Sequence, residues 1–160
     1  TLVQWTITSR LDYCNGLLFR ISDHLMNKLQ RLQNAAARLI TGAARSVHIT
    51  PHLIELHWLP VHFRVRYKVL LTTFKALHDL APEYLSTLLQ PYAPPRVLSS
   101  GDQKLLAVPD FRLKSFGGRA FSCVAPRLWN DLPQYMRDID SLAAFKASLK
   151  THLFKEAYKV

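Results

Sequence analysis

The stretch HWLPVHFRVRYKVLLTTFKALHDLAP, residues 57–82, is the part of the chain around which the other segments are organised. Pro60 suits the first position of a helix, because proline lacks only an N–H that would be unpaired there, and Pro82 opposes continuation at the far end. Between the two prolines, apolar residues at helical spacing form two separate faces, one around Val65 and one around Phe74. The stretch therefore predicts one long helix that is packed on both sides.

A basic line separates these two apolar faces. Arg64, Lys68 and Lys75 lie at positions i, i+4 and i+11, and no acidic residue falls on their strip. The line is typical of a solvated helix face, but it also fits a face that contacts phosphate groups. The residues alone leave both interpretations open.

The composition describes a globular chain with a basic excess. The 160 residues are 49% hydrophobic, which is enough for one sizeable core or two small ones. The formal net charge of +10 favours a polyanionic partner, because Lys and Arg beside phosphates release condensed counterions. The excess is spread along the chain without a block of like charge, so any surface for nucleic acid has to be made by folding.

The cysteines and the hydropathy pattern bear on compartment. Cys14 and Cys123 are far apart and have no CxxC partner, which argues against a zinc module and a disulfide scaffold and favours a reducing compartment. The sequence has neither an apolar run of about 18 residues nor a secretory leader. We therefore expect an intracellular protein, cytoplasmic or nuclear, without a membrane partner. Because the chain begins at Thr1 and not at Met, we also expect it to be a piece of a longer protein.

The expected fold class is mainly α, in two domains. Residues 1–90 should form a bundle of about five helices, and a Pro/Ser-rich linker at 91–101 should separate them from an α+β extension at 102–160. The five expected helices cover 2–19, 22–41 with Gly42 as its left-handed cap, 50–57, the central stretch, and 82–89. In the extension we expect a short β-hairpin from 104–108 and 111–116, a helix at 119–131 interrupted at Pro126 with strand as an alternative for 119–125, and a C-terminal helix that begins after Asp140 or Ser141.

Catalytic chemistry has no clear candidate in this sequence. His48, His52, His57 and His62 lie near one another in the chain but do not share one regular face, as a zinc site would require. The carboxylates are scattered, whereas two-metal nucleases and polymerases need them clustered. We expect no catalytic residue, no metal or other cofactor, and no small-molecule substrate.

Two further basic groups are candidates for binding. Arg31 and Arg38 lie two turns apart on the 22–41 helix, where plain solvation is the alternative. Arg112, Lys114 and Arg119 alternate with phenylalanines, a combination that suits charge and stacking on single-stranded nucleic acid. The alternative is that these phenylalanines, Phe111, Phe116 and Phe121, belong to the core.

Six segments, taken in order, resemble one family. They look like successive blocks of the region that follows the catalytic palm in reverse transcriptases of non-LTR, LINE-type retrotransposons. The words Leu-His-Trp-Leu-Pro and Ala-Pro-Arg-Leu-Trp-Asn are the most specific, and together the blocks cover most of the chain. The six blocks are SRLDYCNGLL (9–18), KLQRLQNAAARLITG (28–42), HITPHLIELHWLPV (48–61), YKVLLTTFKALHDLAPEYLSTLL (67–89), RLKSFGGRAFSCVAPRLWNDLP (112–133) and SLAAFKASLKTHLF (141–154).

The resemblance implies a function and a place in a larger enzyme. Residues 1–90 are similar to the helical thumb, which grips the template–primer duplex, and 91–160 to a C-terminal extension. The family's metal-binding aspartates lie upstream, in a Tyr-x-Asp-Asp turn and an earlier strand that this chain lacks; Leu11-Asp12-Tyr13 is part of an expected helix and is not that turn. Asp79 stands where many relatives have glycine.

The expected function follows from the resemblance and the charge. The chain should be a non-catalytic C-terminal fragment of an RNA-directed DNA polymerase that binds the backbone of RNA or an RNA–DNA hybrid and contacts the upstream palm domain. The alternative is a transposon-derived structural or protein-interaction helical module without retained activity. The candidate nucleic-acid-binding residues are Arg31, Arg38, Arg64, Lys68, Lys75, Arg112, Lys114 and Arg119.

Overall fold

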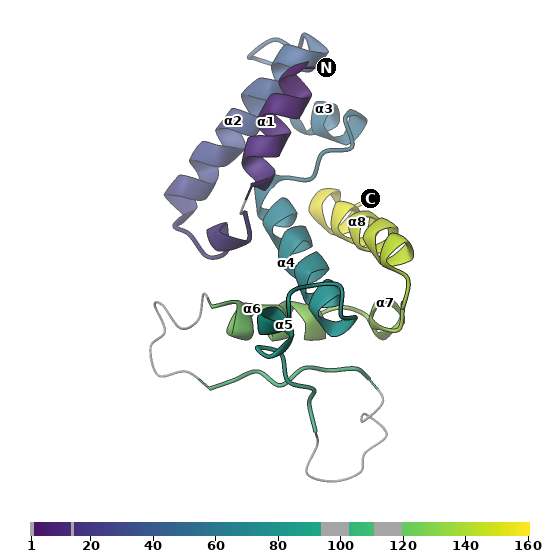
Figure 1. The fold of residues 1–160 in the computed structure, drawn as a ribbon. Helices are drawn as coiled ribbons and strands as arrows, with labels where there is room; N and C mark the ends of the chain where they lie inside the picture. The colour runs from purple at the N-terminus through teal and green to yellow at the C-terminus, as the bar shows by residue number, and fades with distance from the viewer. Residues whose placement is uncertain (1, 14, 94–102, 111–119) are drawn as a thin grey trace. The chain divides into compact units, whose positions relative to one another are not determined.

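The structure, a computed structural model, is mainly helical, as expected. It describes residues 2–13, 15–93, 103–110 and 120–160 (Figure 1). Its helices are α1 (Leu2–Asp12), the 3-10 turn η1 (Asn15–Leu18), α2 (Asp23–Thr41), α3 (Thr50–Glu55), α4 (Val61–Leu77), α5 (Glu83–Ser86), α6 (Phe121–Asn130), α7 (Gln134–Arg137) and α8 (Leu142–Tyr158). The short α7 was not predicted, and α4 ends before the expected limit at Pro82.

The chain divides into two compact units. Unit 1 consists of Thr1–Arg66 and His152–Val160, and unit 2 consists of Tyr67–Thr151. This division does not coincide with the predicted one at 91–101. Residues 67–77 of α4 belong to unit 2, where Phe74 is fully buried against Phe145 of α8 with ring centroids 4.3 Å apart. Within unit 2, this aromatic contact joins segments that lie on either side of residues 91–101 in the sequence.

The core of unit 1 lies where α2 and α3 meet the loop before α4. Ala36 and Ala37 of α2, Leu53 of α3 and Trp58 are buried together. The small alanine side chains let α3 approach α2 closely. Gly42 ends α2 with a φ of 70°, so the predicted left-handed cap is confirmed.

The core of unit 2 is built on aromatic side chains. Trp129 of α6 lies beside Phe145, with centroids 5.8 Å apart, and both are almost completely buried. The guanidinium of Arg137 is buried as well, and it donates hydrogen bonds to the backbone carbonyls of Gln103, Asn130 and Leu132. Backbone acceptors satisfy this charged group in place of a carboxylate.

The predicted β-hairpin is not supported. Its first arm, 104–108, forms only an isolated antiparallel bridge, between Leu106 and Pro91, and its second arm lies outside the described residues. Side chains of α6 bind the backbone here instead. The amide of Asn130 pairs with both the N–H and the carbonyl of Leu106, at 2.9 and 2.8 Å, and the indole of Trp129 donates to the Lys104 carbonyl at 2.9 Å.

The strand alternative for 119–125 is also wrong for the part that is described, since α6 begins at Phe121. This helix continues through Pro126 and is not interrupted there. Proline removes one backbone hydrogen bond inside a helix. The burial of flanking side chains offsets that loss, because Cys123, Val124, Ala125, Leu128 and Trp129 are all buried.

Candidate nucleic-acid interface

A groove lined by three arginines lies at the C-terminal end of α2 in unit 1. We call it the arginine groove; its volume is about 1010 Å³, and its lining residues are Arg31, Asn34, Ala35, Arg38, Leu39, Gly42, Ala43 and Arg45. The helical spacing places Arg31 and Arg38 on one face, and the left-handed turn at Gly42 brings Arg45 beside them. No carboxylate is among these lining residues.

The three guanidinium groups differ in how they are held. Arg38 is half-buried, and its Nη2 donates a hydrogen bond to the Val47 carbonyl at 3.2 Å, while its Nε is buried without a partner in the part of the chain described. Arg31 and Arg45 are exposed. The groove thus combines one positioned cation with two cations open to a ligand.

Arg45 was missed in the sequence analysis. It stands outside any periodic segment, in the loop that follows α2, so helical spacing gives no signal for it. The cap at Gly42 was the available signal, because a left-handed residue turns the chain back toward the helix end that precedes it.

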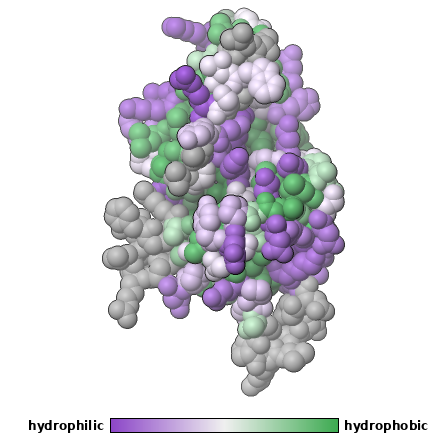
Figure 2. Space-filling model, viewed as in Figure 1, coloured by the Kyte–Doolittle hydropathy of each residue, from purple (hydrophilic) through white to green (hydrophobic). Residues whose placement is uncertain are grey.

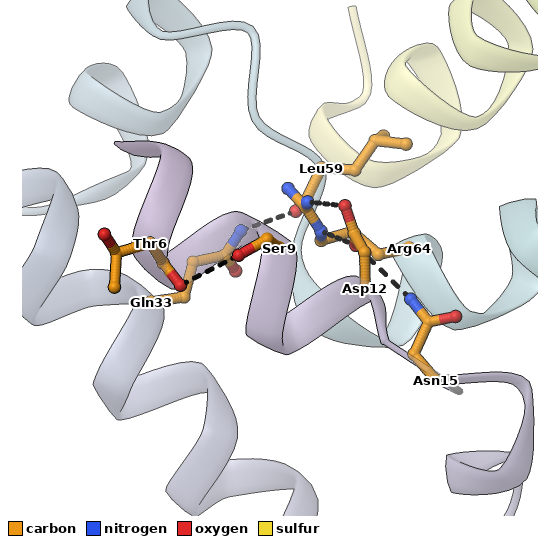
Figure 3. A network of polar contacts seen from close by, with 7 residues as sticks. All are labelled: Thr6, Ser9, Asp12, Asn15, Gln33, Leu59 and Arg64. Atoms are coloured by element: carbon orange, nitrogen blue, oxygen red, sulfur yellow. Dashed lines mark hydrogen bonds and ion pairs between the residues drawn. The ribbon is translucent and has the colours of Figure 1, made fainter. Parts of the chain in front are cut away.

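Arg64, the first residue of the basic line on α4, forms an ion pair in the structure. Its Nε and Nη2 bind the two carboxylate oxygens of Asp12, at 2.9 and 2.5 Å, and Asn15 donates to the same carboxylate at 3.4 Å (Figure 3). No acidic residue lies on the strip itself, but folding brings a carboxylate from another helix against Arg64. The pairing is tertiary, because Asp12 ends α1, far from α4 in the sequence.

Lys68 and Lys75 lie on the part of α4 that belongs to unit 2. Lys68 is exposed and Lys75 is half-buried, and Thr72 between them donates to the Lys68 carbonyl at 2.9 Å. With Arg64 paired, these two lysines remain as a smaller basic pair.

The third basic group falls outside the described residues, which include neither Arg112, Lys114 and Arg119 nor Phe111 and Phe116. Phe121, the last phenylalanine of that group, begins α6 and is half-buried. On the face of the molecule drawn in Figure 2, hydrophilic and hydrophobic residues are interspersed and do not gather in one block.

Three of the four neighbouring histidines, His52, His57 and His62, make separate contacts. His52 lies 3.8 Å from the Glu55 carboxylate, His57 stacks on Phe154 with centroids 6.1 Å apart, and His62 meets the edge of Phe63 at 5.4 Å. Partial burial and the neighbouring Arg66 charge lower the pKa of His62, against the opposite influence of Glu156. Within the described residues, no three His, Cys, Asp or Glu side chains are grouped so that they would hold a metal ion.

Two further observations bear on the expectations from sequence. Cys123 is a buried free thiol. No helix among the described residues is long and apolar enough to cross a membrane.

Comparison of the chain with models of protein families, with curated proteins and with solved structures finds no match. The likeness to LINE-type reverse transcriptases therefore rests on the quoted sequence words.

Proposed function

We propose that this chain is a non-catalytic, nucleic-acid-binding segment of a LINE-type reverse transcriptase and acts inside the cell. In this proposal residues 1–90 act as a thumb-like helical bundle, residues 102–160 as its C-terminal extension, and an upstream palm domain supplies the polymerase chemistry. The ligand is the phosphate backbone of RNA or of an RNA–DNA hybrid. Binding of this kind needs no cofactor in the chain.

The arginine groove is the observation that carries the proposal. Guanidinium groups bind phosphate oxygens through paired N–H donors and keep their charge at every physiological pH. Arg31 and Arg45 are exposed, and no acidic side chain lines the groove to compete with a phosphate for them. The net charge of +10 adds a long-range attraction for any polyanion.

A titration against a labelled RNA–DNA hybrid at several salt concentrations tests the proposal. Each phosphate contact contributes about 0.9 to the slope of log affinity against log salt concentration. The double variant Arg31→Gln/Arg45→Gln is therefore expected to bind more weakly and to flatten the slope by about 1.8. Arg38 is left unchanged because its bond to Val47 also has a structural role.

The matched control removes the same charge elsewhere. Lys146→Gln/Lys150→Gln takes two exposed cations from α8, and this variant should keep nearly the full slope. Equal losses in the two double variants would mean that binding reflects net charge alone, and the groove would then have no special part in it. Parallel titrations with duplex RNA and single-stranded RNA of equal length identify the preferred form.

A protein-interaction role is the second candidate, because three leucines of α2 are exposed on unit 1. Their exposed fractions are 50% for Leu25, 52% for Leu32 and 69% for Leu39.

A further inference from the structure

The exposed leucines of α2 form a line beside an apolar groove. Leu25, Leu32 and Leu39 recur at seven-residue intervals, so they lie on one side of the helix over a length of about 21 Å. Each of them is at least half exposed. A single exposed leucine is ordinary, whereas a line of three on one helix face is a feature typical of interaction surfaces.

The groove lies between α1 and α2. It has a volume of about 530 Å³ and is lined by Thr6, Ile7, Arg10, Leu11, Leu29 and Leu32. Four of these six side chains are aliphatic, and they come from both helices. We call this groove, together with the line of leucines, the leucine groove.

The leucine groove differs from the arginine groove in position and in chemistry. On α2, Leu25 and Leu32 point roughly 100° to 140° away from Arg31 and Arg38, as an angle of 100° per residue requires. Only Leu39 borders the arginine groove. A nucleic-acid backbone offers no aliphatic group to bury against Leu25 and Leu32, so the leucine groove fits a protein partner.

The charges at the leucine groove indicate which kind of protein. Arg10 lines it on the α1 side, and Lys28 lies on α2 one turn from both Leu25 and Leu32. Both are exposed, and none of the lining residues is acidic. A second copy of this chain would bring Arg10 and Lys28 against their own counterparts, whereas carboxylates would complement them.

We propose that the leucine groove binds an acidic amphipathic helix. Aliphatic side chains at a seven-residue repeat on that helix would pack against Leu25, Leu32 and the groove between α1 and α2, and flanking carboxylates would face Arg10 and Lys28. This is the helix-in-groove mode of recognition, with charge setting the orientation and the choice of partner.

A designed peptide tests this inference on the full chain. The probe is a helical peptide of about 21 residues with leucine at the a and d positions and glutamate at e and g. It is expected to bind, and Leu25→Ser/Leu32→Ser should weaken binding about 10-fold or more, since two half-exposed leucines lose their burial. Arg10→Gln/Lys28→Gln should weaken binding and reduce its salt dependence. All four residues are exposed, so these variants should fold; circular dichroism and the unfolding midpoint check this.

Control peptides and crossed variants make the outcomes separable. A peptide with serine at a and d, or with lysine at e and g, should not bind. Leu25→Ser/Leu32→Ser should leave affinity for the RNA–DNA hybrid unchanged, and Arg31→Gln/Arg45→Gln should leave peptide affinity nearly unchanged. Failure of the nucleic-acid proposal would therefore not be mistaken for failure of this one.

Three results would overturn the inference. One is the absence of peptide binding, and another is binding that persists at full strength without the two leucines. The third is a dimer of the chain, measured by sedimentation, that Leu25→Ser/Leu32→Ser dissociates, because a second copy would then be the occupant.

Discussion

Asp79, two residues after the end of α4, has a backbone conformation that suits glycine. Its φ is +54°, and the N–H of Leu80 donates to the Lys75 carbonyl at 2.8 Å, the six-residue closure of a Schellman cap. A side chain at this left-handed position costs about 1 kcal/mol, although Asp tolerates it better than most residues. The resemblance to LINE-type sequences implies glycine here in many of them, and a left-handed cap is a conformation that suits glycine.

Asp79→Gly is accordingly expected to stabilise unit 2. The gain should be about 0.5 kcal/mol, because glycine relieves the backbone but loses more conformational entropy on folding. Urea denaturation measures the change. Asp79→Ala is the control; it keeps a Cβ and loses the carboxylate, so it should be no more stable than the parent. A destabilised Asp79→Gly variant would show that the carboxylate matters more than the backbone conformation.

The structure indicates a different role for Arg64 from the one that its sequence position suggests. Its side chain is only 14% exposed, and both of its bonded nitrogens face Asp12. A guanidinium held by two bonds to one carboxylate is geometrically fixed and largely neutralised. We therefore assign Arg64 to the stability of unit 1 and not to phosphate binding.

A double-mutant cycle of Arg64→Met and Asp12→Ala tests this assignment. The coupling energy between the two residues should be about 1 kcal/mol, since one partner is nearly buried and the other is partly exposed. Affinity for an RNA–DNA hybrid should not change with Arg64→Met. A salt slope flattened by about 0.9 would instead return Arg64 to the binding surface.

At the scale of elements, polar side chains of α2 fix where α4 begins. Gln33 is fully buried and donates to the Leu59 carbonyl at 2.8 Å, and Gln30 accepts the N–H of Val61 at 2.9 Å. Gln30 also donates to the Gln33 side chain at 3.0 Å. These bonds satisfy an N–H that every helix start leaves unpaired.

Gln33→Met removes the side-chain hydrogen bonds of Gln33 and nearly conserves the side-chain volume. It leaves the Leu59 carbonyl without its partner in a buried setting, so the free energy of unfolding should fall by about 2 kcal/mol. Chemical denaturation measures the loss. The matched control, Asn27→Met, changes an exposed position of α2 and should remain within about 0.5 kcal/mol of the parent. Similar effects of both variants would mean that Gln33 acts only through helix propensity.

The residues of the sequence Leu-His-Trp-Leu-Pro have distinct structural roles in the loop before α4. His57 has a φ of +53°, which turns the chain after α3, and Trp58 and Leu59 are buried beyond the turn. The Trp58 carbonyl accepts a hydrogen bond from the hydroxyl of Tyr158 in α8. Burial raises the pKa of Tyr158 to about 12, so this hydroxyl remains a donor well into the alkaline range. The backbone of this loop is therefore bound both by α8 and by Gln33 of α2.

The elements also show where sequence patterns stop being informative. Periodicity predicted the helices at α2, α4 and α8, because a 3.6-residue repeat of apolar side chains is a local property. The expectation of a strand at 104–108 was wrong. The backbone there is bound by the side chains of Asn130 and Trp129. A local sequence pattern cannot predict a partner that lies about 25 residues away.

Over the whole chain, the net charge and the charge available to a ligand are different quantities. The net charge of +10 is a sum over residues and was known from composition. The charge that is available to a ligand depends on ion pairing within the fold. Asp12 pairs with Arg64, Glu156 with Arg66 and Asp140 with Lys104. Arg31 and Arg45 keep their charge exposed. A binding surface is thus selected by which cations the fold leaves accessible.

The sequence by itself determined the helical class, the main helices, the left-handed cap at Gly42 and the basic character of the chain. These follow from spacing, from backbone conformational preference and from a count of charges, all of which are local or additive. Only the tertiary structure decided that Arg64 pairs with Asp12, that Arg45 joins Arg31 and Arg38, and that the compact units divide within α4. Each of these depends on which distant side chains meet, and that is set by the packing of the cores.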